Sequence, residues 1–345
     1  MTYIITGTAG FIGTNLALRL LELGERVVGI DNLSRPGAKI NLESLQSYKG
    51  FLFRQGDVRD REFLENIFKN EKQCEVIFHL AAQVAVTTSV KNPREDFDIN
   101  AMGTFNVLEA ARMAELDAAI IYSSTNKVYG KLDQVKVSEY GSRYQYAGGV
   151  KGVDEKQQLD FYSPYGCSKG CGDQYIVDYN RIYGFKTTSF RQSCIYGYNQ
   201  FGVEDQGWVA WFTIAAILGK PLTIFGDGKQ VRDVLFIDDL VDLYIESVGN
   251  IDLLSGQAFN IGGGPENTLS LLELLKLLEE KLGHSIYVCY SDWRPGDQKV
   301  FICNVDKIQE NIGWKPVVSI EEGIEKLYRW CINNSSKLKI ALNQG

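Results

Sequence analysis

A tyrosine and a lysine four residues apart, Tyr165 and Lys169, are the residues of this sequence best suited to moving a proton. The preceding Ser163-Pro164 supplies an N-cap and a first-turn proline, so both side chains are predicted to share one face of a helix. An ordinary phenol has a pKa near 10, and lowering it by ~3 units requires roughly 4 kcal/mol of stabilisation of the phenolate. A lysine ammonium one turn away could supply part of this. Taken alone, the pair is better explained as two surface residues of a helix.

A glycine-rich segment near the start of the chain changes that interpretation. Gly7, Gly10 and Gly13 lie between a predicted strand and a predicted helix. There they would allow a tight turn, close approach to a pyrophosphate and close helix–strand packing, with the helix N-terminus facing the phosphates. The spacing G-x-x-G-x-x-G departs from G-x-G-x-x-G, so a turn without a ligand stays open as the alternative. Together with Tyr165, the loop predicts oxidoreduction of an alcohol, and Thr125 could hydrogen-bond to the reacting hydroxyl.

Carboxylates after the next two strands bear on the choice of dinucleotide. Asp31 ends the second predicted strand, where it could accept hydrogen bonds from a ribose 2′-hydroxyl and repel a 2′-phosphate, which favours NAD over NADP. The nearby Arg35 weakens that preference. Asp57 and Val58 could hold the adenine, but Asp57 is equally well explained as a turn or N-cap residue.

The elements that must position these residues alternate between apolar runs and amphipathic stretches. Buried parallel strands are predicted at 3–6, 26–30, 51–53, 76–78, 119–122 and 186–190, with helices at 11–23, 97–116 and 165–183 between them. Later strands are predicted at 222–225 and 234–237, with helices at 208–218, 238–248 and 270–282. We therefore predict an α/β fold, a Rossmann-type doubly wound parallel sheet with a smaller C-terminal α+β substrate domain. The expected division is 1–195 for the NAD-binding domain, mainly 196–333 for the nucleotide-sugar domain, and 334–345 as a loose tail.

Composition narrows the class of protein. The 345 residues carry a net charge of −7 and no basic block, which argues against nucleic acid and anionic membrane surfaces as partners. No apolar run is long enough to span a bilayer, and we expect no signal peptide. Seven irregularly spaced cysteines indicate reduced thiols and a cytoplasmic protein. No Cys or His spacing suggests a metal, and His79 is expected to be a packed core residue.

Several motifs together resemble the extended short-chain dehydrogenase/reductase family of nucleotide-sugar enzymes. They are the three glycines, Asp31-Asn32, His79-Leu-Ala-Ala82, Ser123-Ser-Thr125, Val128-Tyr129-Gly130, Tyr165-x-x-x-Lys169 and Gln230-Val-Arg232-Asp233. The resemblance covers nearly the whole chain. It implies a tightly bound, recycled NAD and catalysis by Thr125, Tyr165 and Lys169. The implied cofactor contacts are Gly7, Gly10, Phe11, Ile12, Asp31, Asn32, Ser34, Arg35, Asp57, Val58, Leu80, Ala81, Ala82, Asn100, Ser123, Tyr165 and Lys169.

Within the family, the stretches 124–127, 159–169 and 205–209 are similar to enzymes that invert C2 of CDP-linked deoxyhexoses. The resemblance implies that Arg232 and Arg294 grip a diphosphate and that Asp297 accepts from a ribose hydroxyl. Arg232 could instead pair with Asp233 or Asp238. The further implied substrate contacts are Gln83, Thr87, Asn126, Lys127, Gln206, Gly207 and Trp208. Trp208 could equally start a core helix, and Lys127 could equally face solvent.

Enzymes with other activities share parts of this set of motifs. In related 4,6-dehydratases an acid pair follows the threonine, and Asn126-Lys127 stands there instead, so elimination lacks its usual acid. A 4-epimerase shares every motif, because pocket shape selects the carbon. Asp31 disfavours a reductase that consumes NADPH, and a non-catalytic NAD-binding module would be expected to lack Tyr165 or Lys169. Relatives pair the helices near 97–116 and 165–183 across a dimer, so a homodimer or homotetramer is expected.

Overall fold

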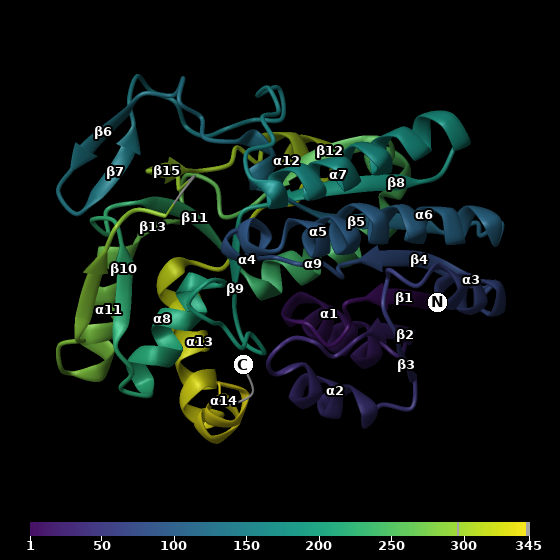
Figure 1. Ribbon diagram of the computed structural model, residues 1–345, viewed down its shortest axis with the longest axis horizontal. Coiled ribbons are helices and arrows are strands. Elements are labelled where there is room, and N and C mark those ends of the chain that lie inside the picture. Colours follow the sequence, from purple (N-terminus) through teal and green to yellow (C-terminus); the bar gives the residue numbers. More distant parts are fainter. Residues whose placement is uncertain (295–296, 343–345) are drawn as a thin grey trace.

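A seven-stranded parallel sheet forms the centre of the larger part of the molecule (Figure 1). The computed structural model describes residues 1–294 and 297–342. The strand order is β12-β8-β5-β4-β1-β2-β3, and each neighbouring pair is parallel. The strands are β1 (Thr2–Thr6), β2 (Arg26–Asp31), β3 (Phe51–Gln55), β4 (Cys74–His79), β5 (Ala119–Thr125), β8 (Thr187–Gln192) and β12 (Gln257–Ile261). The predicted doubly wound parallel sheet is confirmed.

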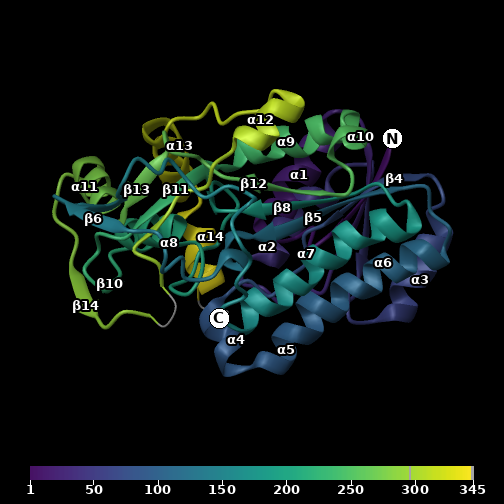
Figure 2. The ribbon, with the colours of Figure 1, turned by 90° about the horizontal axis from the view of Figure 1, so that it is seen from above.

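Helices cover both faces of this sheet, which explains its continuous apolar runs (Figure 2). Neighbouring strand residues point to opposite faces, so Ile4 packs with Val107 and Leu108 of one face, whereas Ile5 packs with Leu16 of the other. The first face carries α3 (Arg61–Asn70), α6 (Gly103–Met113) and α7 (Pro164–Tyr183), and the second carries α1 (Phe11–Glu22) and α9 (Ile237–Gly249). α2 (Ala38–Gln46) packs on α1 and β3.

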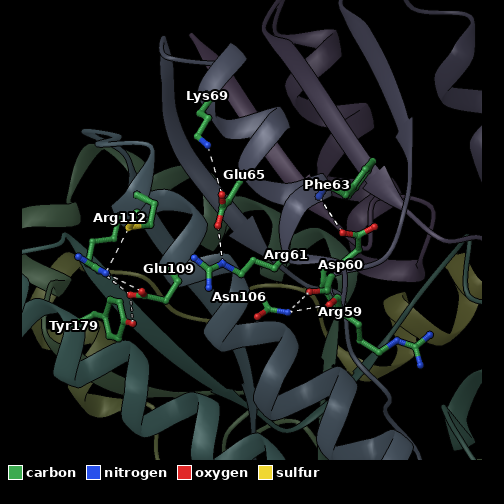
Figure 3. A network of polar contacts seen from close by, with 12 residues as sticks. Arg59, Asp60, Arg61, Phe63, Glu65, Lys69, Asn106, Glu109, Arg112 and Tyr179 are labelled. Carbon is green, nitrogen blue, oxygen red and sulfur yellow. Dashed lines mark hydrogen bonds and ion pairs between the residues drawn. The ribbon is translucent and has the colours of Figure 1, made fainter.

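Polar contacts tie the helices of the first face together (Figure 3). The Tyr179 hydroxyl of α7 donates to Glu109 of α6 at 2.6 Å, and Glu109 also accepts from Arg112 at 2.7 and 2.8 Å. The Asn106 side chain of α6 donates to the carbonyls of Val58 and Arg59, at 3.0 and 3.1 Å, just before α3. The Tyr179–Glu109 contact fixes α7, the helix that carries Tyr165, against α6.

Within residues 1–294 and 297–342, the smaller part of the molecule holds three short sheets and several helices. β9 (Cys194–Tyr196), β11 (Val231–Phe236), β13 (Thr268–Ser270) and β15 (Val300–Phe301) form one sheet, β10 (Leu222–Phe225) pairs with β14 (Val288–Ser291), and β6 (Val137–Tyr140) pairs with β7 (Arg143–Tyr146). The helices here are α8 (Trp208–Ile217), α11 (Leu271–Leu282), α13 (Ile320–Asn333) and α14 (Ser335–Leu342). The shorter helices of the chain are α4 (Val86–Lys91), α5 (Pro93–Phe97), α10 (Ile251–Leu254), α12 (Asp306–Ile312), a π-helix at Asp98–Met102 and a 3-10 helix at Asn126–Tyr129.

Capping residues in the sequence predict some helix ends correctly, whereas other predicted helix and strand boundaries differ from the structure. The capping box of Ser270 and Glu273 starts α11, and the left-handed Gly283 ends it. The helix predicted at 97–116 is wrong in extent, because α5 runs into a π-helix before α6 begins. The strand predicted at 234–237 starts earlier and ends at Phe236, since Ile237 opens α9.

The division of the chain is less simple than a single boundary at residue 195. Residues of β12 complete the large sheet beside β8, and α9 packs on α1, so the chain crosses back after residue 196. The boundary therefore stays a prediction. We expected residues 334–345 to be loose, yet 335–342 form α14, in which Leu338 and Ala341 are buried against the core. The remaining residues of that expected tail, 343–345, lie outside the described residues.

Candidate active site

The glycine loop between β1 and α1 is built for a close approach of backbone segments. Gly7 has a φ of +74°, and a Cβ on it would lie 2.8 Å from the Ala81 nitrogen. A Cβ on Gly13 would lie 2.2 Å from the Gly7 carbonyl oxygen, which confirms the predicted close packing of helix on loop. No side chain caps the N-terminus of α1 at Gly10. Its first-turn N–H groups are therefore left to meet an anion.

Asp31 holds the glycine loop in place at the end of β2. Its carboxylate accepts from the Ala9 nitrogen at 3.0 Å and from the Leu33 nitrogen at 2.8 Å. Burial raises the pKa of Asp31 above its ordinary value, and these backbone hydrogen bonds oppose that effect. Each oxygen keeps further acceptor capacity, so a ribose hydroxyl can still be bound.

Asp57 lies beside Asn32 and Arg59. It accepts from the Asn32 amide at 2.7 Å and from the Arg59 backbone and guanidinium at 2.8–2.9 Å. Burial alone would raise the pKa of Asp57, but the hydrogen bonds from Arg59 and Asn32 outweigh it and set it at about 2. The N-cap of α3 is Asp60, so Asp57 is not the cap of that helix.

A cleft at the carboxyl ends of β1, β2 and β4 brings most of the predicted cofactor residues together. Thirteen of them line it: Gly7, Gly10, Phe11, Ile12, Asp31, Asn32, Ser34, Arg35, Asp57, Val58, Leu80, Ala81 and Ala82. Residues that the sequence did not single out also line the cleft: Asn41, Val84, Ile99, Asn199, Gln200, Phe201 and Gly202. Gln206, expected at the substrate, lines this cleft as well and accepts from the Arg35 guanidinium.

Thr125 and Tyr165 meet at the same edge of the sheet. Thr125 ends β5, the neighbour of β4, and Tyr165 lies in the first turn of α7, where Ser163 caps the helix as predicted. Burial raises the pKa of Tyr165 to about 12, and the nearby Thr125 hydroxyl opposes this rise only in part. The Tyr165 backbone nitrogen donates to the Ser89 hydroxyl at 3.1 Å, which fixes the start of the helix. The phenol is thus buried near Thr125, and its pKa lies well above neutral pH.

Lys169 is buried one turn further along α7. Its ammonium donates to the Ser123 carbonyl and lies 4.1 Å from the centroid of the Tyr122 ring. Burial lowers the pKa of Lys169 to about 7, although Asp173 and Asp96 oppose this. Lys169 therefore joins the end of β5 to α7.

A buried polar network underlies this helix and involves two predicted ligand contacts. Asp96 accepts from Ser168 at 2.5 Å, from the Gln83 side chain at 3.0 Å and from Asn100 at 3.2 Å. Asn100 also holds the Gln83 backbone at 2.9 and 3.0 Å, and the Gln83 side chain bonds to Ala85. In this structure Asn100 and Gln83 position the segment after β4. His79 is fully buried between Thr6 and Thr104, and burial lowers its pKa to about 3, which confirms it as a core residue.

Positive side chains gather beyond the end of β5. Arg232 of β11 is buried and pairs with Asp297, not with Asp233 or Asp238. Lys127 is half-buried, and both burial and the nearby charge of Arg232 lower its pKa, while Asp297 raises it. Lys127 therefore lies within the electrostatic influence of Arg232 and Asp297.

Arg294 lies against a loop from the smaller part. It pairs with Asp205 at 3.1 Å, donates to the Glu204 carbonyl at 3.2 Å, and its guanidinium lies 3.9 Å from the Phe225 ring centroid. Trp208 opens α8 and packs edge-on against Phe212 at 6.3 Å.

The last predicted substrate contacts lie on short elements. The Asn126 side chain accepts from the Thr125 hydroxyl at 3.4 Å, and Gly207 is the left-handed N-cap of α8. The buried Thr87 hydroxyl and the Trp208 indole nitrogen have no hydrogen-bond partner among the described residues. Neither residue lines the dinucleotide cleft.

Comparisons with known proteins agree with this geometry. The model of the GDP-mannose 4,6-dehydratase family matches residues 4–327. The chain belongs to this family of NAD-dependent nucleotide-sugar epimerases and dehydratases. It is 47% identical to a CDP-paratose 2-epimerase of Salmonella typhi, over 96% of this chain and 99% of that one. It is also 32% identical to a putative UDP-glucose 4-epimerase of Methanocaldococcus jannaschii, over 96% and 99%.

Solved structures of family members have the same fold. The UDP-glucose 4-epimerase of Thermotoga maritima with UDP-glucose matches with a TM-score of 0.84 and 32% identity, over 97% of this chain and all of that one. The UDP-glucuronic acid 4-epimerase of Bacillus cereus, in complex with UDP-glucuronic acid and NAD, matches with a TM-score of 0.83 and 29% identity, over 96% and 99%. This chain is therefore an enzyme of the epimerase/dehydratase family.

Two further findings concern the rest of the molecule. None of the described helices is long and apolar enough to cross a membrane. Within residues 1–294 and 297–342, no group of three His, Cys, Asp or Glu side chains could hold a metal ion.

Proposed function

We propose that this protein is an NAD-dependent epimerase that inverts C2 of a CDP-linked deoxyhexose, as in the conversion of CDP-paratose to CDP-tyvelose. The reaction type is supported by the buried Tyr165 phenol, which lies near Thr125 at the same sheet edge as the dinucleotide cleft. The choice of sugar and nucleotide is supported by the 47% identity to a CDP-paratose 2-epimerase.

The cleft fits NAD on structural grounds. The uncapped α1 and the glycine loop would hold the pyrophosphate, and Asp31 would accept from the adenosine ribose. Asn32, Asp57 and Val58 would border the adenine, and Lys169, beside Ser123, would bind the nicotinamide ribose. When bound, NAD supplies the acceptor and donor of the hydride and, in its oxidised form, a positive charge that lowers the pKa of the phenol.

Tyr165 would carry the proton. Its phenolate oxygen takes the proton of the C2 hydroxyl as that carbon is oxidised, and returns the same proton when the carbonyl is reduced. Thr125 would hydrogen-bond to the same sugar oxygen and orient it. Because burial holds the pKa of Tyr165 at about 12, its basic form needs added positive charge, so proton removal is coupled to the cofactor's oxidised state.

The diphosphate would lie among the cations beyond β5. Arg232 and Arg294 would grip it, and Lys127 lies near Arg232 at the position that carries an acid in related dehydratases. Asp297, now paired with Arg232, would turn to a ribose hydroxyl. Gln83, Thr87, Asn126, Gly207 and Trp208 are proposed to border the sugar or base.

A 4-epimerase acting on a UDP-sugar is the second candidate. The 32% identity to the Thermotoga maritima UDP-glucose 4-epimerase favours it, and that protein has a TM-score of 0.84 with this one. A 4,6-dehydratase is disfavoured because Asn126 and Lys127 cannot act as the carboxylic acid that protonates a leaving hydroxyl.

The purified protein should be incubated separately with CDP-paratose, CDP-glucose and UDP-glucose, and the ring-proton couplings read by NMR. We expect inversion at C2 of CDP-paratose, and none in a Tyr165→Phe control. Inversion confined to C4 of UDP-glucose, a 4-keto-6-deoxy product from CDP-glucose, or unchanged CDP-paratose would each contradict the proposal.

We also propose a cytoplasmic homodimer or homotetramer. Large apolar side chains are exposed on α5, α6, α7 and the π-helix, as a helix-to-helix interface would require: Phe97, Met102, Met113, Tyr175, Ile182 and Tyr183. All seven cysteines are free thiols, which supports a reducing compartment. Light scattering coupled to size-exclusion chromatography would give twice or four times the 38.7 kDa chain mass, and a monomer would contradict the assembly.

A further inference from the structure

A segment of the smaller part of the molecule forms one wall of the dinucleotide cleft. We call residues 198–206 the strap. They follow β9 and lead to α8, far in sequence from the glycine loop, yet Asn199, Gln200, Phe201, Gly202 and Gln206 all line the cleft. The cofactor site is thus completed by residues from beyond residue 195.

Asparagines of the first two helices anchor the start of the strap. Asn15 of α1 donates to the Tyr198 carbonyl at 3.0 Å and accepts from the Asn199 side chain at 3.0 Å. Asn41 of α2 donates to the Asn199 carbonyl at 3.2 Å. α1 and α2 border the cleft, so the strap is fixed to the half of the protein that holds the dinucleotide.

Phe201 anchors the middle of the strap by packing. Its ring lies directly on Gly37, where an added Cβ would be 2.1 Å from a ring carbon, and its other neighbour is Trp330 of α13 at 5.8 Å between centroids. Gly37 has a φ of +79°, so both conformation and space require glycine there.

Two arginines hold the end of the strap. Arg35, which lines the cleft after β2, donates to the Gln206 side chain. On the other side, Arg294 holds Asp205 and the Glu204 carbonyl. Opening the cleft along this wall would require breaking these contacts.

Gln200, one of the residues that line the cleft, has unused hydrogen-bonding capacity. Its side chain is only 5% exposed, and its amide oxygen has no partner within the described part of the chain. Its amide nitrogen makes one long contact, 3.4 Å, with the Ile195 carbonyl. A buried amide oxygen without a partner is costly, and a donor on a bound ligand would satisfy it.

We propose that the strap retains the cofactor, with Gln200 accepting a hydrogen bond from the dinucleotide and the Arg35–Gln206 contact closing the cleft over it. This role rests on the proposed binding of NAD. It accounts for a dinucleotide that stays bound through successive turnovers, because release must wait for the strap to open.

The test is the rate at which NAD leaves the protein. Wild type, Gln200→Leu and Gln206→Ala are saturated with NAD, passed through a desalting column, and assayed for bound NAD over time after acid denaturation. The exposed Gln309→Ala on α12 is the matched control. Melting temperatures of the NAD-saturated proteins show that each variant is folded, and Gln206→Ala keeps its backbone pairing with Val203.

Loss of one hydrogen bond should speed NAD release about 5-fold in each strap variant and leave Gln309→Ala at the wild-type rate. Release within 2-fold of wild type in both strap variants would overturn the proposed role of the strap while leaving the NAD enzyme intact. A wild-type protein that binds no NAD at saturation would overturn the proposed function and the strap together.

Discussion

Replacing Lys169 with methionine should change how the stability of this protein depends on pH. The ammonium is buried in the folded protein, where burial lowers its pKa from the ordinary 10.5 to about 7. Between those values the unfolded chain keeps the proton that the folded protein has released, so wild-type stability rises with pH across pH 7–10.5 and is lowest below pH 7. Methionine fills similar space without a charge and lacks this dependence.

The magnitude follows from the pKa difference. Across the whole range between the two pKa values, the free energy of unfolding changes by about 5 kcal/mol. About 3 kcal/mol of this change falls between pH 7.0 and 9.5. Urea unfolding of NAD-depleted protein, in reductant, should therefore show the free energy of unfolding rising by about 3 kcal/mol more in wild type than in Lys169→Met. The exposed Lys276→Met on α11 should follow wild type. Parallel pH profiles for wild type and Lys169→Met would refute the account of a buried, neutralised lysine.

Three further outcomes follow from the site and its supports. Tyr165→Phe should lower kcat about 10²–10⁴-fold while the NAD content per chain stays at the wild-type level, and a loss under 10-fold would mean that another group moves the proton. Gly13→Ala places a Cβ 2.2 Å from the Gly7 oxygen and should cost about 1–3 kcal/mol of stability and lower NAD occupancy, whereas unchanged occupancy would show that the loop can shift freely. Asp173→Asn leaves the buried Arg191 without its 2.7 Å ion-pair partner and should lower the free energy of unfolding by about 3–5 kcal/mol. A urea midpoint close to that of wild type would contradict this expectation.

Short-range patterns in the sequence predicted the sheet and the dinucleotide loop. Apolar runs such as 3–6 and 119–122 are buried on both faces, which is why they read as continuous rather than alternating. The Ser270–Glu273 capping box and the Ser163 cap depend only on neighbours in the chain, and both occur. Close packing at Gly13 likewise follows from one turn of backbone.

Contacts between distant segments could not be predicted in the same way. Residues 257–261 give no local sign that they pair with β8, since strand pairing depends on the whole sheet. The Arg35–Gln206 contact joins residues 171 positions apart, so Gln206 was expected at the substrate and not at the dinucleotide cleft. The resemblance placed Asn100 at the cofactor, and its bonds to the Gln83 backbone, 17 positions away, had no local signal in the sequence.

The hydrogen on C2 of the substrate can be followed directly through the proposed reaction. CDP-paratose carrying deuterium at C2 is incubated with the enzyme in ordinary water, and the product is examined by NMR and mass spectrometry. We expect CDP-tyvelose that keeps the deuterium at C2, because the hydride that leaves this carbon returns to it. Product with a C2 proton taken from water, or inversion at any other carbon, would contradict it.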